Sequence, residues 1–238
     1  MPDKHTRNHG SMKLFYILVE PAVSGNIGAA ARALKTMGQQ HLILVNPAPY
    51  FNDEAKMLGH GSWDILENAQ VYKSFDDVVN NFDFLIGTSA KNRSVKYDYY
   101  PVEKAKTILY NKNNSIQKAA IVFGREERGL TNDELQACDI ISYVPMAISY
   151  PSLNLAQAVM LYAYLFASSP GTFSEENNST ENQELYKIAK SKTSISLDCL
   201  GLNENSPIHN RIMERVALLN ADDLHLVLSV CNKILDKN

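Results

Sequence analysis

Short apolar runs alternate with amphipathic segments along the chain up to about residue 168. The runs are rich in β-branched and aromatic residues, which is typical of buried strands. Strands are predicted at Leu14–Val19, His41–Val45, Val71–Tyr72, Phe82–Thr88, Ala119–Phe123 and Ile140–Val144. Helices are predicted at Ile27–Met37, Phe75–Asn80, Pro101–Tyr110, from Thr131 onward and at Leu153–Ala167. This alternation favours an α/β fold with a mostly parallel sheet, in which ligands bind beyond the carboxyl ends of the strands.

Capping residues mark several predicted helix ends. Thr131 and Glu134 have the spacing of a capping box, and Pro101 suits the first position of a helix. Asn26 is the predicted N-cap of the first helix, and Ser152 is the predicted N-cap of the helix that ends near residue 167.

Changes in composition predict the domain organisation. Residues 1–11 are polar, and we interpret them as an added leader or a frayed extension. Residues 12–168 form the predicted main domain, and the stretch 169–182, rich in Ser, Glu and Asn, is a predicted linker. Residues 183–238 are predicted to form a small all-helical extension. Its helical spacing covers Gln183–Thr193, Pro207–Leu219 and Ala221–Ile234.

Composition narrows the class of protein. With 45% hydrophobic residues the chain can bury a core, and no apolar run approaches the roughly 20 residues that span a bilayer. The three cysteines form no Cys-x-x-Cys pair, and the six histidines show no metal-ligand spacing. We therefore expect reduced thiols, a cytoplasmic location, no metal and no membrane partner.

The formal net charge of −3 does not favour nucleic-acid binding, but the distribution of charge matters more than its sum. One local stretch combines basic and aromatic side chains, which suits contact with RNA and, more commonly, a solvated loop. Its residues are Lys91, Arg93, Lys96, Tyr97, Tyr99 and Tyr100.

The first segment that could carry chemistry leaves the first strand and enters a helix, as Ser24-Gly-Asn-Ile-Gly-Ala-Ala-Ala-Arg32. Gly28 and Arg32 lie one turn apart, so a substrate could approach Arg32 over Gly28. On spacing alone, an ordinary capped helix with a surface arginine is the better explanation. The Gly-x-Gly-x-x-Gly fingerprint is absent, which counts against a dehydrogenase-type nucleotide binder.

The second segment, Phe123-Gly-Arg-Glu-Glu-Arg-Gly129, follows a buried strand. Gly124 at the end of that strand would let a ligand lie against the backbone. The charges of Arg125, Glu126 and Arg128 fit a solvated turn equally well.

The third segment runs from Val144-Pro-Met to Ser152-Leu-Asn154 and enters the next helix. Free backbone N–H groups gather at such a helix start. Capping explains Ser152 well and Asn154 poorly, so we expect a functional role for Asn154.

In this order, the three segments resemble the motifs of the SpoU/TrmH (SPOUT) family of RNA 2′-O-ribose methyltransferases, most closely its TrmJ-like and LasT-like members. Asn-x-Gly-x-x-x-Arg at 26–32 is similar to motif one, and Phe-Gly-x-Glu-x-x-Gly at 123–129 to motif two. Ser-Leu-Asn-Leu at 152–155 is similar to motif three. The resemblance extends over about residues 14–167.

The resemblance implies a C-terminal deep trefoil knot, a homodimer and S-adenosyl-L-methionine (SAM) as cofactor. It places SAM against Thr88, Ser89, Ala90, Gly124, Val144, Pro151, Ser152 and Leu153. Related sequences tend to have a polar residue at the position of Pro151, so the contact there becomes backbone-only.

The implied reaction moves a methyl group from SAM to a ribose 2′-hydroxyl of RNA. A tRNA anticodon loop is the implied substrate, with nucleotide 32 as the candidate position. Arg32 would reach this hydroxyl from the partner subunit, as a general base or as an electrostatic stabiliser. A free guanidinium has a pKa above about 12, which favours the second role. The implied catalytic residues are Arg32, Asn26, Ser152, Asn154 and Glu126, and the RNA-binding candidates are Arg32, Lys91, Arg93 and Lys96. Ribosomal RNA as substrate and a non-catalytic RNA-binding role of the same fold stay open as alternatives.

Overall fold

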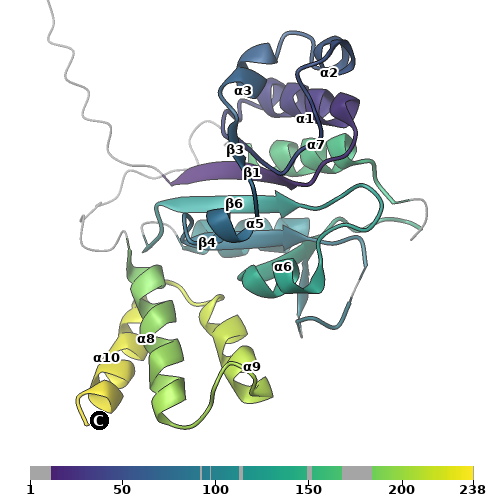
Figure 1. Ribbon diagram of the computed structural model, residues 1–238. Helices are drawn as coiled ribbons and strands as arrows, with labels where there is room; N and C mark the ends of the chain where they lie inside the picture. The colour runs from purple at the N-terminus through teal and green to yellow at the C-terminus, as the bar shows by residue number, and fades with distance from the viewer. Residues whose placement is uncertain are drawn as a thin grey trace, which may run out of the picture.

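A computed structural model describes residues 12–91, 93–96, 98–112, 115–148, 152–167 and 184–237. Its seven strands form one parallel sheet in the order β3-β2-β1-β6-β4-β7-β5 (Figure 1). The strands are β1 (Lys13–Val19), β2 (Leu42–Val45), β3 (Gln70–Tyr72), β4 (Phe84–Thr88), β5 (Tyr99–Pro101), β6 (Lys118–Phe123) and β7 (Ile140–Tyr143). The helices of the main domain are α1 (Ser24–Thr36), α2 (Asp53–Leu58), α3 (Trp63–Glu67), α4 (Asp76–Val79), α5 (Val102–Asn111), α6 (Asn132–Ala137) and α7 (Leu155–Phe166). The predicted α/β class and parallel sheet are confirmed.

Helices cover both faces of the sheet, because successive strand residues point to opposite sides. In β1, Tyr16 and Leu18 are buried in the cluster that includes α1, α5 and α7. Ile17 and Val19 are buried in a second cluster with α4 and α6. Figure 1 shows α1 and α7 above the sheet and α6 below it. Burial on both faces explains why these strands read as continuous apolar runs.

The start of α1 differs from the prediction. The helix begins at Ser24, and the residue before it, Val23, makes no side-chain cap. The predicted N-cap role of Asn26 is therefore wrong, since Asn26 lies inside the first turn. Its side chain is free to bond to a distant part of the chain.

The start of α7 also differs from the prediction. Asn154, not Ser152, is the N-cap, and its side chain accepts a hydrogen bond from the Ala156 N–H at 2.8 Å. Gln157 completes a capping box by accepting from the Asn154 N–H at 3.1 Å. By contrast, the predicted capping box of Thr131 and Glu134 is present at α6.

Two short helices, α2 and α3, and the short strand β5 were not predicted. Helix α2 packs so closely on α1 that a Cβ atom at Gly28 would lie 2.2 Å from the carbonyl oxygen of Ala55. The expectation that Gly28 leaves room for a substrate beside Arg32 is therefore wrong. The backbone of α2 fills that space.

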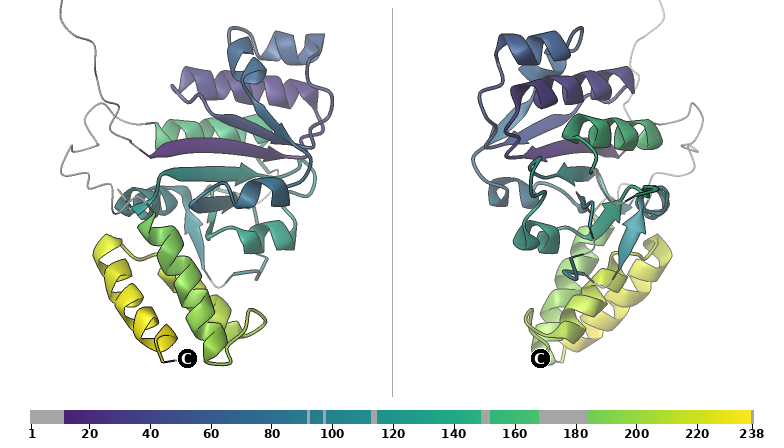
Figure 2. Two further views of the ribbon diagram at one scale, coloured as in Figure 1. Left: turned by 60° about the vertical axis from the view of Figure 1, so that its left-hand side comes forward. Right: turned by 90° about the vertical axis from the view of Figure 1, so that its right-hand side faces the viewer.

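Three helices follow the main domain, as the spacing in 183–238 predicted: α8 (Leu185–Cys199), α9 (Pro207–Val216) and α10 (Ala221–Leu235). Figures 1 and 2 show them as a group at one end of the sheet, away from α1, α2 and α3. Tyr186 of α8 packs edge-on against Phe84 of β4, with the ring centroids 5.4 Å apart. The predicted leader and the predicted linker lie outside the described residues.

Candidate active site

A cavity of about 480 Å³ lies where the loops after β4, β6 and β7 meet. These strands are neighbours in the sheet, so their carboxyl ends bring together three segments that are distant in sequence. All the predicted cofactor-binding residues in the described chain line it: Thr88, Ser89, Ala90, Gly124, Val144, Ser152 and Leu153. Pro151, the eighth predicted residue, lies outside the described residues.

The wall of this cavity requires glycine at position 124. A Cβ atom there would lie 2.1 Å from the Gly129 carbonyl carbon and 2.1 Å from the Leu130 nitrogen. Gly129 adopts φ of +69°, which favours glycine, and its N–H donates to the Arg125 carbonyl at 2.8 Å. The loop therefore folds back on itself and presents backbone and small side chains to the cavity.

The lining suits a ligand with both an apolar and a polar part. Phe123, Leu130, Met146 and Tyr162 provide apolar surface, and the hydroxyls of Thr88, Ser89 and Ser152 with nearby backbone groups provide polar contacts. The volume falls within the roughly 300–1,000 Å³ that is usual for small-molecule sites. An adenine ring and a short amino-acid chain fit this donor set. Sequence reasoning assigned none of Phe123, Leu130, Met146 and Tyr162 to the cofactor site, although Phe123 and Met146 lie in the predicted motif segments, because apolar side chains there are typical of ordinary core.

Three of the predicted catalytic residues form one hydrogen-bonded chain at the edge of this cavity. Asn26 donates from Nδ2 to Glu126 Oε1 at 3.0 Å, and Asn154 donates from Nδ2 to Asn26 Oδ1 at 2.9 Å. Glu126 and Ser152 both line the cavity. The chain thus links α1, the loop after β6 and the start of α7.

The carboxylate of Glu126 is held in its ionised form. Partial burial raises its pKa, but hydrogen bonds from the Ala22 and Val23 N–H groups and from Asn26 outweigh this effect, and the pKa lies below its ordinary value. The negative charge therefore sits at the start of α1, where a helix dipole favours it.

Arg32 does not join this group within one chain. It is exposed on α1 and is not among the residues that line the cavity. It follows Asn26 by six residues, which corresponds to about 9 Å along a helix axis. A site that contains both the cavity and Arg32 would have to take Arg32 from a second copy of the chain.

The predicted RNA-binding residues Lys91, Arg93 and Lys96 separate in space. Lys91 and Arg93 line the cavity, whereas Lys96 faces a second cleft and donates to the Gln136 carbonyl at 3.3 Å. Burial lowers the pKa of Lys96. Arg93 donates from Nη1 to the Leu130 carbonyl at 2.6 Å and from Nη2 to the Arg128 carbonyl. Its guanidinium therefore joins two walls of the cavity.

Arg125 holds the loop after β6 in place. Its guanidinium bonds to Glu20 at 2.7 Å and to both carboxylate oxygens of Glu134 at 2.9 and 3.0 Å. Bonds to both carboxylates raise the pKa of Arg125 further above its ordinary value. Sequence reasoning gave Arg125 no role because Glu20 is distant in sequence. Arg128, also unassigned, is exposed at the cavity rim.

The described residues show neither a membrane-spanning helix nor a cluster of metal ligands. None of their helices has the length and apolar character needed to cross a membrane. Among the same residues, no three His, Cys, Asp or Glu side chains are grouped so that they could hold a metal ion.

The sequence match agrees with this geometry. Residues 13–164, more than half of the chain, match the SpoU rRNA Methylase family. The chain belongs to this family. The family and enzyme class predicted from the sequence are confirmed, and methyltransferases of this SpoU family use SAM.

Named relatives of this SpoU-family chain cover most of its length. The tRNA/rRNA methyltransferase LasT of Escherichia coli (strain K12), itself described as uncharacterized, is 36% identical over 95% of this chain and 100% of that protein. The tRNA (cytidine/uridine-2′-O-)-methyltransferase TrmJ of Citrobacter koseri is 36% identical over 71% of this chain and 69% of that protein. The crystal structure of TrmJ from Z. mobilis ZM4 matches this chain with a TM-score of 0.64 and a sequence identity of 26%. The match covers 94% of this chain and 99% of that chain.

Proposed function

We propose that this SpoU-family chain is a cytoplasmic, SAM-dependent tRNA methyltransferase that modifies a ribose 2′-hydroxyl in the anticodon loop, with nucleotide 32 as the candidate position. The observation that carries the proposal is one cavity lined by the second and third motif segments, with Asn26 of the first segment bonded to Glu126 and Asn154 at its edge. The name of the TrmJ relative supports tRNA as substrate and the ribose as the site of modification.

The residues of the chain would act by positioning and by electrostatics. Bound SAM supplies an activated methyl group on a sulfonium, so the protein needs to align the ribose with it. Gly124 and the small residues at 88–90 leave room for the cofactor against backbone. Glu126, through Asn26, fixes the start of α1, the helix that carries Arg32. The Arg32 guanidinium would stabilise the developing alkoxide and contact the neighbouring phosphate.

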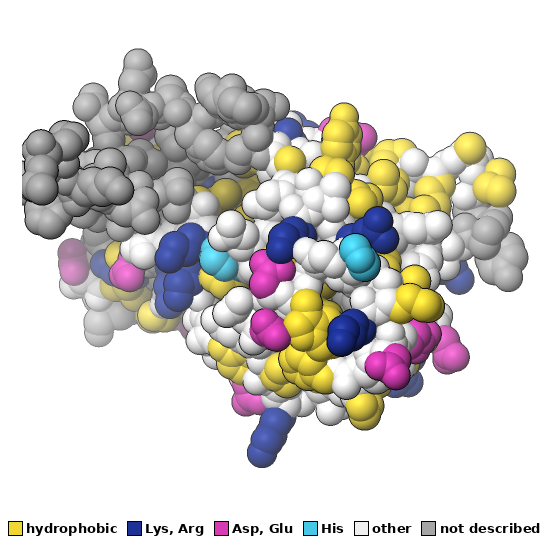
Figure 3. All heavy atoms as spheres, turned by 90° about the horizontal axis from the view of Figure 1, so that it is seen from above, with side chains coloured by type: hydrophobic (Ala, Val, Ile, Leu, Met, Phe, Trp, Pro, Cys, Tyr) yellow, Lys and Arg dark blue, Asp and Glu magenta, His cyan; other side chains and the backbone are white. Residues whose placement is uncertain are grey.

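A homodimer would supply the missing Arg32. The cavity and Arg32 are separated within one chain, and exposed apolar side chains lie before α1 and along α7, namely Val23, Leu161 and Tyr164. Figure 3 shows hydrophobic side chains among basic and acidic ones on the face seen from above. Burying them against a second copy is favourable, and two-fold pairing is the commonest arrangement. The trefoil knot implied by the resemblance stays part of this proposal.

The proposal is tested by methyl transfer from labelled SAM to bulk tRNA. Arg32→Ala should lower turnover at least about a hundredfold while leaving the Kd for SAM within about twofold, since Arg32 does not line the cofactor cavity. Lys35→Ala, which removes another exposed cation of α1, is the matched control and should retain activity. Absence of transfer by the wild-type chain to any tRNA would contradict the proposal.

Ribosomal RNA is the second candidate substrate, because the LasT relative is named a tRNA/rRNA methyltransferase. The same assay with ribosomal RNA decides between the two. A non-catalytic RNA-binding role is disfavoured by the hydrogen bonds that join Asn26, Glu126 and Asn154.

A further inference from the structure

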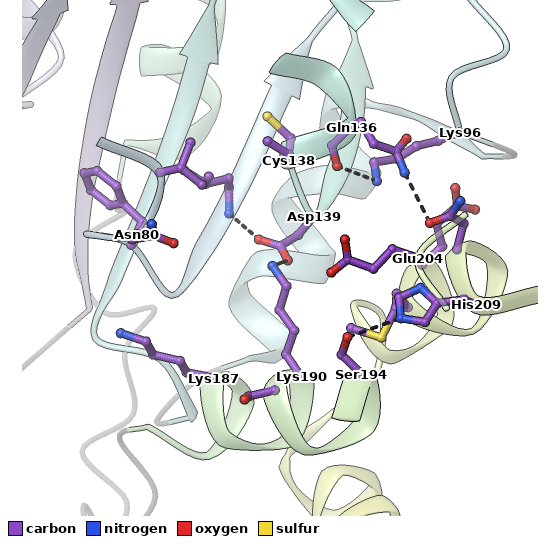
Figure 4. A pocket seen from close by; sticks show the side chains of 18 of the residues that line it. Asn80, Lys96, Gln136, Cys138, Asp139, Lys187, Lys190, Ser194, Glu204 and His209 are labelled. Atoms are coloured by element: carbon purple, nitrogen blue, oxygen red, sulfur yellow. Dashed lines mark hydrogen bonds and ion pairs between the residues drawn. The ribbon is translucent and has the colours of Figure 1, made fainter. Parts of the chain in front are cut away.

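A second, larger cleft of about 980 Å³ separates the helices α8 and α9 from the main domain (Figure 4). Lys96, Gln136 and Asp139 line it on the side of the sheet, and Lys190, His209 and Glu214 line it on the side of the helices. Two sets of contacts connect the helices to the main domain across this cleft, one made by buried groups and one made by exposed groups.

One end is anchored by buried groups. Asp139 is 7% exposed and accepts hydrogen bonds from the Leu85 N–H at 2.8 Å, the Tyr186 hydroxyl at 2.8 Å and Lys190 Nζ at 2.6 Å. Lys112 donates to the Leu219 carbonyl at 2.8 Å. The Lys190 side chain is 41% exposed, but Asp139 and Lys112 are buried, so breaking these bonds would leave buried polar groups unpaired and this end of the helical group is firmly attached.

The other end is held by half-exposed polar groups of α9. Arg211 Nη1 lies 2.8 Å and Arg215 Nη2 3.3 Å from Asp98 Oδ2. Asn210 Oδ1 accepts from Gln136 Nε2 at 3.4 Å. The side chains of Asp98, Arg211 and Arg215 are 36%, 32% and 54% exposed. Ion pairs of this exposure are weak and are screened by salt, so this end of the group can be released while the buried end stays in place.

Asp98 follows a segment of the chain that forms a wall of the cofactor cavity. Ser89, Lys91 and Arg93 of this segment line the cavity. The Tyr99 hydroxyl accepts from the Arg93 N–H at 3.2 Å, and the Arg93 guanidinium bonds to the Leu130 carbonyl on the facing wall at 2.6 Å. The ion pairs of α9 with Asp98 are therefore linked to the cavity through the next residue, Tyr99, which accepts the hydrogen bond from Arg93.

We propose that Arg211 and Arg215 of α9 are positioning residues, which hold Asp98 and, through Tyr99, keep Arg93 and the cavity wall to which it bonds in the shape that receives the cofactor. Because linkage is reciprocal, a bound cofactor should also hold α9 more firmly against the main domain. The proposal rests on the proposed function only in taking SAM as the cofactor.

Calorimetric titration with SAM tests the first half of this proposal. Asp98→Asn should raise the Kd for SAM by about three- to tenfold, and Arg211→Met with Arg215→Met should raise it similarly, as expected for weak ion pairs. Adding Asp98→Asn to the double variant should have little further effect. Asp64→Asn is the control. It breaks the exposed ion pair between Asp64 of α3 and Lys35 near the end of α1, and it should leave the Kd for SAM unchanged.

Hydrogen exchange tests the second half without using activity. SAM should slow amide exchange in α9 of the wild-type chain and have a smaller effect in Asp98→Asn, while α10 serves as the internal reference. Circular dichroism of each variant checks that it is folded. If folded Asp98→Asn and the arginine double variant both bind SAM as tightly as the wild type, the positioning role is wrong and the proposed function stands. If the wild type binds no SAM, both proposals are wrong.

Discussion

Gly124 is the residue at which a single added carbon should affect the cofactor cavity most. Gly124→Ala would place a Cβ 2.1 Å from the backbone of Gly129 and Leu130, so the loop must move. We expect the Kd for SAM to rise more than about tenfold in calorimetry, because a small change in a binding loop misplaces several contacts. Gly28→Ala is the matched control: its Cβ would meet Ala55 at 2.2 Å, away from the cavity, and should lower stability but not SAM affinity of the folded protein. Equal SAM binding by Gly124→Ala and the wild type would contradict this account.

Glu126 should matter for stability as well as for the site. Its two oxygens accept from the Ala22 and Val23 N–H groups and from Asn26, and a glutamine offers only one acceptor oxygen. Glu126→Gln should lower the free energy of unfolding at pH 7 by about 1–3 kcal/mol. Because the folded-state pKa of Glu126 is lowered, its contribution is present above the unfolded value of about 4.3 and is lost as the pH falls through the folded value.

Urea unfolding of the wild type and Glu126→Gln at pH 7 and at pH 3 measures this effect. The difference between the two proteins should shrink at the lower pH. A difference that stays constant between the two pH values would show that the charge of Glu126 is not what stabilises the start of α1.

At the scale of helices and strands, features set by neighbouring residues were predicted correctly, whereas features set by residues distant in the sequence were not. The capping box of Thr131 and Glu134 involves residues three positions apart, so the sequence alone reveals it. Asn26 is a good capping residue by type, but its side chain bonds to Glu126, which lies 100 positions away. The assignment of Ser152 as N-cap failed because α7 starts two residues later, at a position fixed by Asn154.

The candidate site was likewise predictable only in part. The motif segments could be predicted to meet, because the carboxyl ends of neighbouring parallel strands share one edge of a sheet. The sequence gives no sign that Arg93 bonds to the facing loop or that Lys96 turns toward α6, because both depend on tertiary packing. The helices α2 and α3 were missed because each is too short to show a helical period.

We predict that Lys112, which directly follows α5, makes the free energy of unfolding depend on pH. Its side chain is 0% exposed, and burial lowers its pKa to about 7. Its Nζ lies 4.4 Å from the Tyr186 ring centroid and 5.3 Å from that of Phe84, contacts that favour the charged form and oppose the shift. With the folded pKa below the unfolded value of about 10.4, the unfolded chain binds more protons between these values, so stability should rise with pH.

Chemical unfolding of the wild type and Lys112→Met at pH 7 and pH 9 checks this prediction. The wild type should gain up to about 2 kcal/mol more than the variant over this interval, since one pKa unit corresponds to about 1.36 kcal/mol. Parallel changes in the two proteins would mean that Lys112 does not titrate in this range.

At the scale of the whole molecule, the proposed function needs two subunits to form one complete site. At a SAM concentration near the wild-type Kd, Arg32→Ala and Gly124→Ala should each have little activity alone, but mixed dimers contain one site with an intact cavity and the partner's Arg32. Unfolding and refolding an equal mixture should therefore restore about a quarter of wild-type activity, because half the dimers are mixed and each has one working site. If a mixture shown to contain mixed dimers recovers no activity, the Arg32 and the cavity of one site must come from the same chain.

The most direct test of the central claim is the chemical position of the transferred methyl group. Alkaline hydrolysis of RNA requires a free 2′-hydroxyl, so a 2′-O-methylated ribose survives within a dinucleotide. After reaction of the wild-type chain with tRNA and SAM labelled in the methyl group, we expect the label in alkali-resistant dinucleotides, and far less label when Gly124→Ala is used at a SAM concentration near the wild-type Kd. Label recovered in mononucleotides, or equal labelling by Gly124→Ala, would contradict the claim that this cavity directs methyl transfer to the ribose.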